Sequence, residues 1–162
     1  MGSGKTTIGK VVAKKMNMNF IDMDTHIENQ QFKTIPQIFE ILGEEKFRKL
    51  EQKCLQEVSQ YENVIIATGG GAPCHFDNME MMNRYGETIY IRFTGEELLE
   101  RLKHTQIHKR PILAKYPGDN LLPFIMQNLE LREPYYNQAK FKVSGSDVEI
   151  ASQIVKLIQK KI

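Results

Sequence analysis

The segment Gly-Ser-Gly-Lys-Thr-Thr at residues 2–7 limits the possible folds more than any other part of the chain. It stands directly before an amphipathic stretch in which Ile8, Val11, Val12 and Met16 recur at helical spacing. It matches the back half of the phosphate-binding motif G-x-x-x-x-G-K-[ST], which leads into a helix. The glycines let backbone N–H groups close around phosphate oxygens, and the helix N-terminus adds partial positive charge. The alternative is a glycine turn that caps an ordinary helix.

In this motif the lysine side chain reaches the β- and γ-phosphates, and the hydroxyl after it binds Mg²⁺. We therefore expect Lys5 to contact the phosphates of ATP and Thr6 to bind the metal ion. The expected ATP-binding loop comprises Gly2, Ser3, Gly4, Lys5, Thr6 and Thr7.

The full motif begins with a further glycine, and a strand leads into the loop. Both the glycine and the strand would precede Met1. We therefore expect the cell's own protein to be longer than the printed chain, either because the sequence is shortened or because an internal methionine was taken as its start. In a doubly wound P-loop fold the feeding strand is central, so its absence is expected to split the sheet. A nucleotide-binding fragment with impaired catalysis is an alternative that this feature leaves open.

Strand-like and helix-like segments alternate along the chain, which predicts an α/β fold with a parallel sheet and helices on both faces. We expect residues 1–162 to form one domain, because the length is close to the usual one of about 150 residues. The net charge of +2 is too balanced for a nucleic-acid surface, and the apolar runs are too short for a membrane span. Cys54 and Cys74 match no metal spacing, and we expect a reduced, cytoplasmic protein that is a monomer.

Asp22 and Asp24 lie at the end of a short strand-like run, Phe-Ile-Asp. At such a strand tip one carboxylate can approach Mg²⁺ while the other faces a substrate hydroxyl. The alternative interpretation is a solvated loop in which Asp24 or Thr25 caps the following helix.

Three consecutive glycines and three arginines complete the candidate residues. The glycines follow a buried strand at 63–67, where ligands of open α/β sheets bind, unless they form only a flexible turn. An arginine fork matches a carboxylate or a phosphate with two parallel hydrogen bonds, although a lone surface arginine usually has no such role. These residues are Gly69, Gly70, Gly71, Arg48, Arg110 and Arg132.

In their order along the whole chain, these motifs resemble the shikimate kinase family. The order is G-S-G-K-T-T-I-G, F-I-D-x-D-x-x-I-E, I-x-x-I-F, G-E-x-x-F-R-x-L-E, G-G-G-A, R-P-[IL]-L and L-R-x-P-Y-Y. Several P-loop kinases share the first motif, whereas the later set in this order is specific. The resemblance implies a three-layer P-loop kinase fold with a central parallel sheet, shikimate-binding helices at about 24–60 and a lid at about 104–118. It also implies transfer of the γ-phosphate of ATP to the 3-hydroxyl of shikimate.

The resemblance also assigns roles to the candidate residues. Asp24 would hold the 3-hydroxyl and take its proton, while Asp22 would hold Mg²⁺ through water. Arg48 and Arg132 would grip the shikimate carboxylate, assisted by the glycine amides. Arg110, on the lid, would close over the phosphates of ATP. ATP and shikimate are thus the expected partners, and Mg²⁺ is the expected cofactor.

The chain departs from the family pattern near the expected adenine site. Lys103 and His104 stand where family members often present an arginine, and the segment 143–147 lacks a common proline. The adenine contacts are therefore left open. A runner-up is another P-loop kinase for a small hydroxyl acceptor, of the gluconate or nucleoside-monophosphate type, which would not require the arginine pair.

Overall fold

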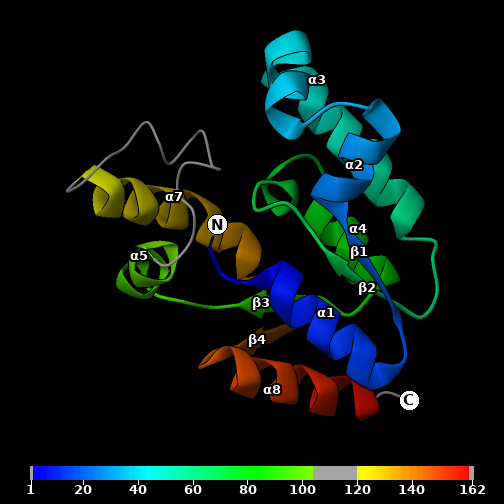
Figure 1. The fold of residues 1–162 in the computed structure, drawn as a ribbon, viewed down its shortest axis with the longest axis vertical. Coiled ribbons are helices and arrows are strands. Elements are labelled where there is room, and N and C mark those ends of the chain that lie inside the picture. Colours follow the sequence, from blue (N-terminus) through cyan, green and yellow to red (C-terminus); the bar gives the residue numbers. More distant parts are fainter. Residues whose placement is uncertain (1, 104–119, 161–162) are drawn as a thin grey trace.

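The computed structural model describes residues 2–103 and 120–160, in which helices and strands alternate (Figure 1). The expected lid and Arg110 lie outside the described residues. The helices are α1 (Lys5–Met16), α2 (Met23–Gln31), α3 (Ile35–Val58), α4 (Asn78–Tyr85), α5 (Gly95–Lys103), α7 (Leu121–Tyr136) and α8 (Asp147–Gln159), with a 3₁₀ turn η1 (Ala72–Cys74). The strands are β1 (Asn19–Asp22), β2 (Val64–Ala67), β3 (Ile89–Ile91) and β4 (Phe141–Val143).

The four described strands form two separate parallel pairs. β1 pairs with β2, with Asn19 opposite Val64, and β3 pairs with β4, with Ile89 opposite Phe141. The split sheet expected from the sequence is therefore present in the described part of the chain. Strands β2 and β3 are also shorter than the sequence segments that predict them.

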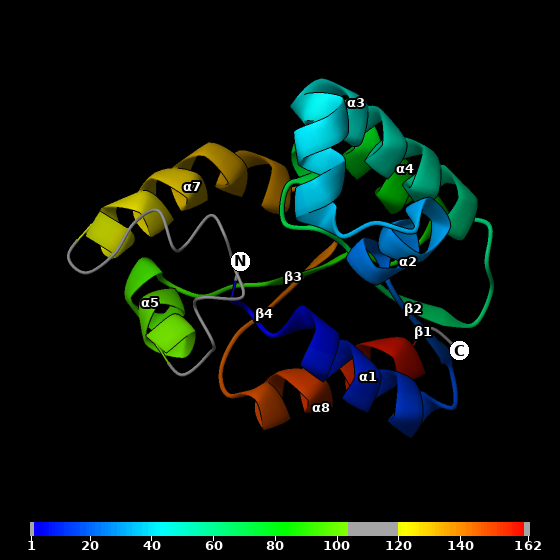
Figure 2. The same cartoon turned by 45° about the horizontal axis from the view of Figure 1, so that its top comes forward.

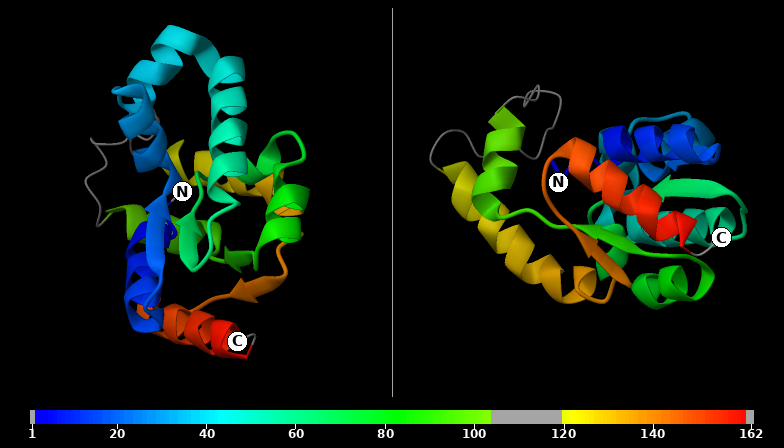
Figure 3. Two further views of the ribbon diagram at one scale, coloured as in Figure 1. Left: turned by 90° about the vertical axis from the view of Figure 1, so that its right-hand side faces the viewer. Right: turned by 90° about the horizontal axis from the view of Figure 1, so that it is seen from below.

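Two apolar cores hold the elements in place. One joins α1, β4, α5, α7 and α8 and includes Ile8, Val12 and Leu102. The other lies under α2 and α3 and includes Met23, Ile27 and Leu55. Figure 2 shows α2 and α3 together above α1, and α8 lies along α1, as the two views of Figure 3 also show. None of the described helices is long and apolar enough to cross a membrane.

Local chemistry explains the boundaries that position the candidate residues. The Asp22 carboxylate caps α2 by accepting hydrogen bonds from the backbone N–H groups of Asp24 and Thr25, at 3.1 and 3.3 Å. The cap expected at Asp24 or Thr25 is therefore wrong, and the strand-ending Asp22 supplies it. Gly43 breaks α3 with φ of 75° and ψ of 171°, a backbone conformation that favours glycine.

Candidate active site

The predicted phosphate loop lies at the N-terminus of α1. Gly4 has φ of 76°, in the left-handed region that favours glycine, and the helix begins at the next residue, Lys5. A Cβ at Gly4 would lie only 2.7 Å from Nη2 of Arg101, so a larger residue would also displace that arginine. The loop is thus shaped to present backbone N–H groups at a helix N-terminus, the arrangement that binds phosphate.

Two oxygen atoms suited to a magnesium ion meet beside this loop. The Thr6 hydroxyl donates a hydrogen bond to Oδ2 of Asp22 at 2.6 Å, which joins the start of α1 to the end of β1. Lys5 Nζ donates to the Ser3 hydroxyl at 3.3 Å. Mg²⁺ prefers oxygen ligands and takes one or two from protein while keeping waters and substrate phosphates. The oxygen atoms of Thr6 and Asp22 are of the kind that this ion takes, and their role as its ligands stays a prediction.

Asp24, two residues beyond the strand tip, has an environment that suits a base. Burial is the main cause that raises the pKa of the Asp24 carboxyl above 3.8, and repulsion by Asp22 adds to it. The nearby positive charges of Lys5 and Arg48 lower the pKa in part. A carboxylate with a raised pKa accepts a proton more readily than an ordinary one.

A buried ion pair faces Asp24 across the glycine loop. Arg48 Nη1 donates to Oε2 of Glu51 at 2.8 Å, and Glu51 is only 1% exposed. Burial raises the pKa of Glu51, whereas its bond to Arg48 lowers it. Arg48 Nη2 reaches the exposed Glu44 at 3.2 Å. The guanidinium is thus held between an inner and an outer carboxylate.

The glycine loop after β2 packs directly against these groups. A Cβ on Gly69 would lie 2.7 Å from Oε1 of Glu51 and 3.1 Å from Oδ1 of Asp24. A Cβ on Gly71 would lie 2.8 Å from Nη1 of Arg48. The glycines are therefore required by close approach, because any side chain would push into the carboxylates or the guanidinium.

Arg132, on α7, brings a second positive charge to the same place. Burial lowers the pKa of His75, and the charges of Arg48 and then Arg132 lower it further. Arg132 also acts on Glu51, where its charge lowers the carboxyl pKa. The charges of both arginines therefore reach His75, in the short turn that follows the glycine loop, and the shared role of Arg48 and Arg132 stays a prediction.

Apart from Arg110, the predicted residues gather around one place in the described structure. The phosphate loop with Lys5 and Thr6 meets Asp22, and the charges of Lys5 and Arg48 both lower the pKa of Asp24. Gly70 joins the cluster because its carbonyl accepts a hydrogen bond from the Tyr136 hydroxyl at 2.6 Å. Arg110 lies outside the described residues, and its predicted role is untested.

Three residues near the site were given no role by the sequence analysis. Glu51 could have been found, because it is an acid within the apolar stripe of α3 formed with Phe47 and Leu55. Tyr136 ends the L-R-x-P-Y-Y motif but was given no role, and Arg101 carries no such signal. Arg101 Nε donates to the Gly2 carbonyl at 3.1 Å, and its Nη2 pairs with Asp147 at 2.7 Å, so it braces the phosphate loop.

Comparisons with known proteins agree on one family. The family model described as shikimate kinase matches residues 1–162. A shikimate kinase of Bacteroides thetaiotaomicron is 45% identical over 160 residues, which cover 99% of this chain and 91% of that protein. A crystal structure of shikimate kinase from the same organism has a TM-score of 0.91 at 42% identity, covering 98% of this chain and 94% of that one. The Acinetobacter baumannii shikimate kinase in complex with shikimate has a TM-score of 0.86 at 32% identity, covering 99% and 89%.

Proposed function

The chain belongs to the shikimate kinase family, which moves the γ-phosphate of ATP to the 3-hydroxyl of shikimate, and we propose that the cluster around Asp24 carries out this reaction. The observation that carries the proposal is the meeting of the Asp24 carboxylate, the Arg48–Glu51 pair and the glycine loop at Gly69. A hydroxy acid needs both a base for its hydroxyl and cations for its carboxylate. The cluster supplies both within one site.

The phosphate loop binds the donor. Backbone N–H groups at the start of α1 receive the ATP phosphates, and Lys5 neutralises charge on the β- and γ-phosphates. Thr6 and Asp22 would hold Mg²⁺, Asp22 through water, and the ion would supply positive charge to the phosphate oxygens. Arg110 lies outside the described residues, and its role at the phosphates of ATP stays a prediction.

The acceptor is held at its opposite end. Arg48 and Arg132 bind the carboxylate of shikimate, and the amides of Gly70 and Gly71 assist. With the carboxylate fixed, only one ring hydroxyl faces Asp24 and the γ-phosphate. Because phosphoryl transfer needs little covalent chemistry from the protein, this positioning is the main contribution of the site.

The transfer itself requires one proton movement at Asp24. The 3-oxygen of shikimate forms a bond to the γ-phosphorus while the bond from that phosphorus to the bridging β,γ-oxygen breaks. The hydroxyl proton passes to the Asp24 carboxylate, and ADP leaves with the electron pair of the broken bond. The raised pKa of Asp24 favours this acceptance.

The Glu51 carboxylate is expected to orient Arg48 for the substrate. Glu51→Gln keeps the shape of the side chain but removes the charge that holds Nη1 at 2.8 Å. Loss of a charge-assisted hydrogen bond costs about 1.5–3 kcal/mol, and we expect about tenfold or greater weakening of shikimate binding. Isothermal titration of shikimate with ADP and Mg²⁺ present measures the effect and tests the proposed site.

Glu44→Gln is the matched control, because Glu44 contacts the same arginine from the exposed side. An exposed ion pair contributes only about 0–1 kcal/mol, so this variant is expected to bind shikimate nearly as the unmodified chain does. Equal weakening by both substitutions, or by neither, would contradict the placement of the shikimate carboxylate at Arg48.

Tyr136 is expected to hold the glycine loop against the helix that carries Arg132. Its hydroxyl donates to the Gly70 carbonyl at 2.6 Å, and its ring packs on Tyr90 with centroids 5.1 Å apart. Tyr136→Phe removes this hydrogen bond and the side-chain hydrogen bond between Tyr136 and Arg132, each worth about 0.5–1.5 kcal/mol, and should raise the KM for shikimate at least about two- to tenfold with kcat less affected. Steady-state kinetics checks this split.

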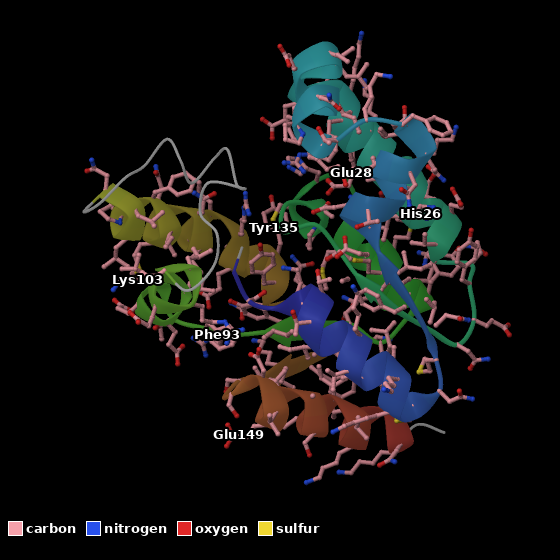
Figure 4. The ribbon with its side chains drawn as sticks, viewed as in Figure 1. His26, Glu28, Phe93, Lys103, Tyr135 and Glu149 are labelled. Atoms are coloured by element: carbon pink, nitrogen blue, oxygen red, sulfur yellow. The ribbon has the colours of Figure 1, made fainter. Side chains whose placement is uncertain are left out.

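The neighbouring Tyr135→Phe serves as control, because Tyr135 is exposed on the same helix (Figure 4). It makes the same chemical change one residue away and should leave both constants unchanged. A rise in KM with Tyr135→Phe as large as that with Tyr136→Phe would show that helix α7, and not the bond to Gly70, is responsible.

The cytoplasmic location and the monomeric state stay predictions.

A further inference from the structure

The glycine loop is followed by a short turn whose hydrogen bonds close back on the loop. The backbone N–H of Ala72 donates to the Gly69 carbonyl at 3.2 Å, and that of Cys74 donates to the Gly71 carbonyl at 2.9 Å. Two of the three glycine carbonyls therefore accept hydrogen bonds from the 3₁₀ turn η1, while the third accepts from Tyr136. The shape of the glycine loop thus depends on where η1 lies.

The side chain of Asn78, the first residue of α4, holds η1 from inside the protein. Its Nδ2 donates to the Ala72 carbonyl at 2.8 Å, and the residue is 0% exposed. The backbone N–H of Asn78 donates to the His75 carbonyl at 3.3 Å. Asn78 therefore binds both the first residue of η1 and the residue that follows its last one, and so fixes the turn between them.

The other side-chain atom of Asn78 shows that this position is not chosen for the core alone. Its Oδ1 is buried and accepts no hydrogen bond from the part of the chain that the structure describes. A buried acceptor without a donor disfavours folding, so an apolar side chain would suit the position better if packing alone decided it. The amide is useful here because its Nδ2 holds the Ala72 carbonyl.

The start of α4 is also tied to α3, the helix that carries Arg48. Gln52 of α3 donates from Nε2 to Oδ1 of Asp77 at 3.0 Å, and Asp77 stands directly before Asn78. A Cβ on Gly71 would lie between 2.8 and 3.0 Å from Nη1, Nη2 and Cζ of Arg48. Asp77 and Asn78 thus hold α3 and the glycine loop together, near the place where Gly71 lies against the guanidinium.

We propose that Asn78 is a positioning residue for the acceptor site, which acts by fixing the amides of Gly70 and Gly71 through the turn η1. The role rests on the proposed function, in which these amides assist the two arginines in binding the carboxylate of shikimate. Asn78 is itself fully buried and acts only through the turn. A loop that is held less firmly binds the acceptor less tightly, whereas transfer to an acceptor that is already bound changes less.

The test is Asn78→Ala, with two readouts. In the chain without ligands, the rate at which iodoacetamide alkylates Cys74 reports how firmly η1 is held, and the buried Cys54 is the internal reference. Alkylation of Cys74 is expected to become at least about threefold faster, because a turn that has lost its anchor opens more often. In steady-state kinetics the KM for shikimate should rise about three- to tenfold, while kcat and the KM for ATP change less than about twofold.

Asn83→Ala is the matched control, on the same helix. Asn83 also donates from Nδ2 to a backbone carbonyl, that of Gln138 at 2.9 Å, and it accepts a hydrogen bond from the Thr88 hydroxyl. The control therefore loses bonds of the same kind away from η1, and it should leave the alkylation rate of Cys74 and the KM for shikimate unchanged. If Asn78→Ala does not fold, Asn78→Ser takes its place, because its hydroxyl ends one bond short of the position of Nδ2 and leaves a smaller gap.

An unchanged alkylation rate of Cys74 would overturn the proposal, whatever the kinetics show. Faster alkylation with an unchanged KM for shikimate would also overturn it, and would leave Asn78 a residue of the fold only. Equal effects of the Asn78 and Asn83 variants would assign both readouts to general loss of stability and would count against it in the same way. Absence of shikimate-dependent turnover in the unmodified chain would instead overturn the proposed function, and with it the acceptor role of Asn78, while the alkylation rate would still show whether Asn78 holds the turn.

Discussion

Asp24→Asn is expected to lower kcat for shikimate phosphorylation about 10²–10⁴-fold, the range typical of a lost general base. Asparagine keeps the size of the side chain but cannot take the proton from the 3-hydroxyl. The thermal midpoint should stay the same or rise, because burial and repulsion by Asp22 disfavour the charged carboxylate in the folded chain. Coupled ADP release and thermal unfolding check both halves of the prediction. A chain that loses stability together with activity would contradict the assignment.

The pH profile gives an independent check on Asp24. The base must be ionised to act, so kcat should fall as the pH drops through the raised pKa of this carboxyl, at a pH above 3.8. The free energy of unfolding changes with pH in the opposite direction from kcat. Near the raised pKa of Asp24, the folded chain binds the proton more tightly than the unfolded chain does. The contribution of Asp24 to the free energy of unfolding therefore decreases as the pH rises through it. If the remaining activity of the Asp24→Asn variant still falls at the same acidic pH, the fall is caused by another group.

Substitution of Arg48 or Arg132 is expected to have the second large effect, on the KM for shikimate. Arg132→Lys and Arg48→Lys each keep the charge but lose the planar fork that binds a carboxylate with two hydrogen bonds. At about 1.5–3 kcal/mol for a charge-assisted bond, the KM for shikimate should rise about 10–100-fold in each variant, while the KM for ATP changes little. Initial rates at varied shikimate and fixed ATP measure this.

Arg84→Lys is the matched control, because Arg84 forms only an exposed pair with Glu80 on α4. It should leave both Michaelis constants unchanged. An Arg132→Lys variant with normal KM for shikimate, or with a raised KM for ATP alone, would show that Arg132 serves the nucleotide or no ligand. The two lysine variants are also expected not to be additive, because both arginines act on one carboxylate.

The local motifs were predictable from the sequence because each encodes its own geometry. The phosphate loop requires the left-handed backbone that Gly4 adopts, and the helix after it follows from the spacing of Ile8 and Val12. Asp22 lies at the end of β1, as predicted, because a short apolar run followed by polar residues stops at the rim of the sheet, whereas Asp24 lies in the first turn of α2.

The residues that hold the site together could not be predicted in the same way. Tyr136 and Gly70 are 66 residues apart, and only the packing of α7 over the glycine loop brings them within 2.6 Å. The pairing of Arg101 with Gly2 spans 99 residues and has the same origin. The cap of α2 was misassigned because Asp22, Asp24 and Thr25 all have suitable side chains, and the strand end alone decides between them.

The family and its reaction were predictable because the order of motifs is specific, and the comparisons confirm both. The split of the sheet was also expected, since the strand that would feed the phosphate loop was placed at its centre.

The most direct test of the whole account is ADP release with ATP and Mg²⁺, in the presence and absence of shikimate. It is made on the chain as printed. The account predicts ADP release that saturates with shikimate and yields 3-phosphoshikimate in equal amount, with gluconate inactive as acceptor. Nucleotide binding without shikimate-dependent ADP release would contradict it and leave the site as a nucleotide-binding module.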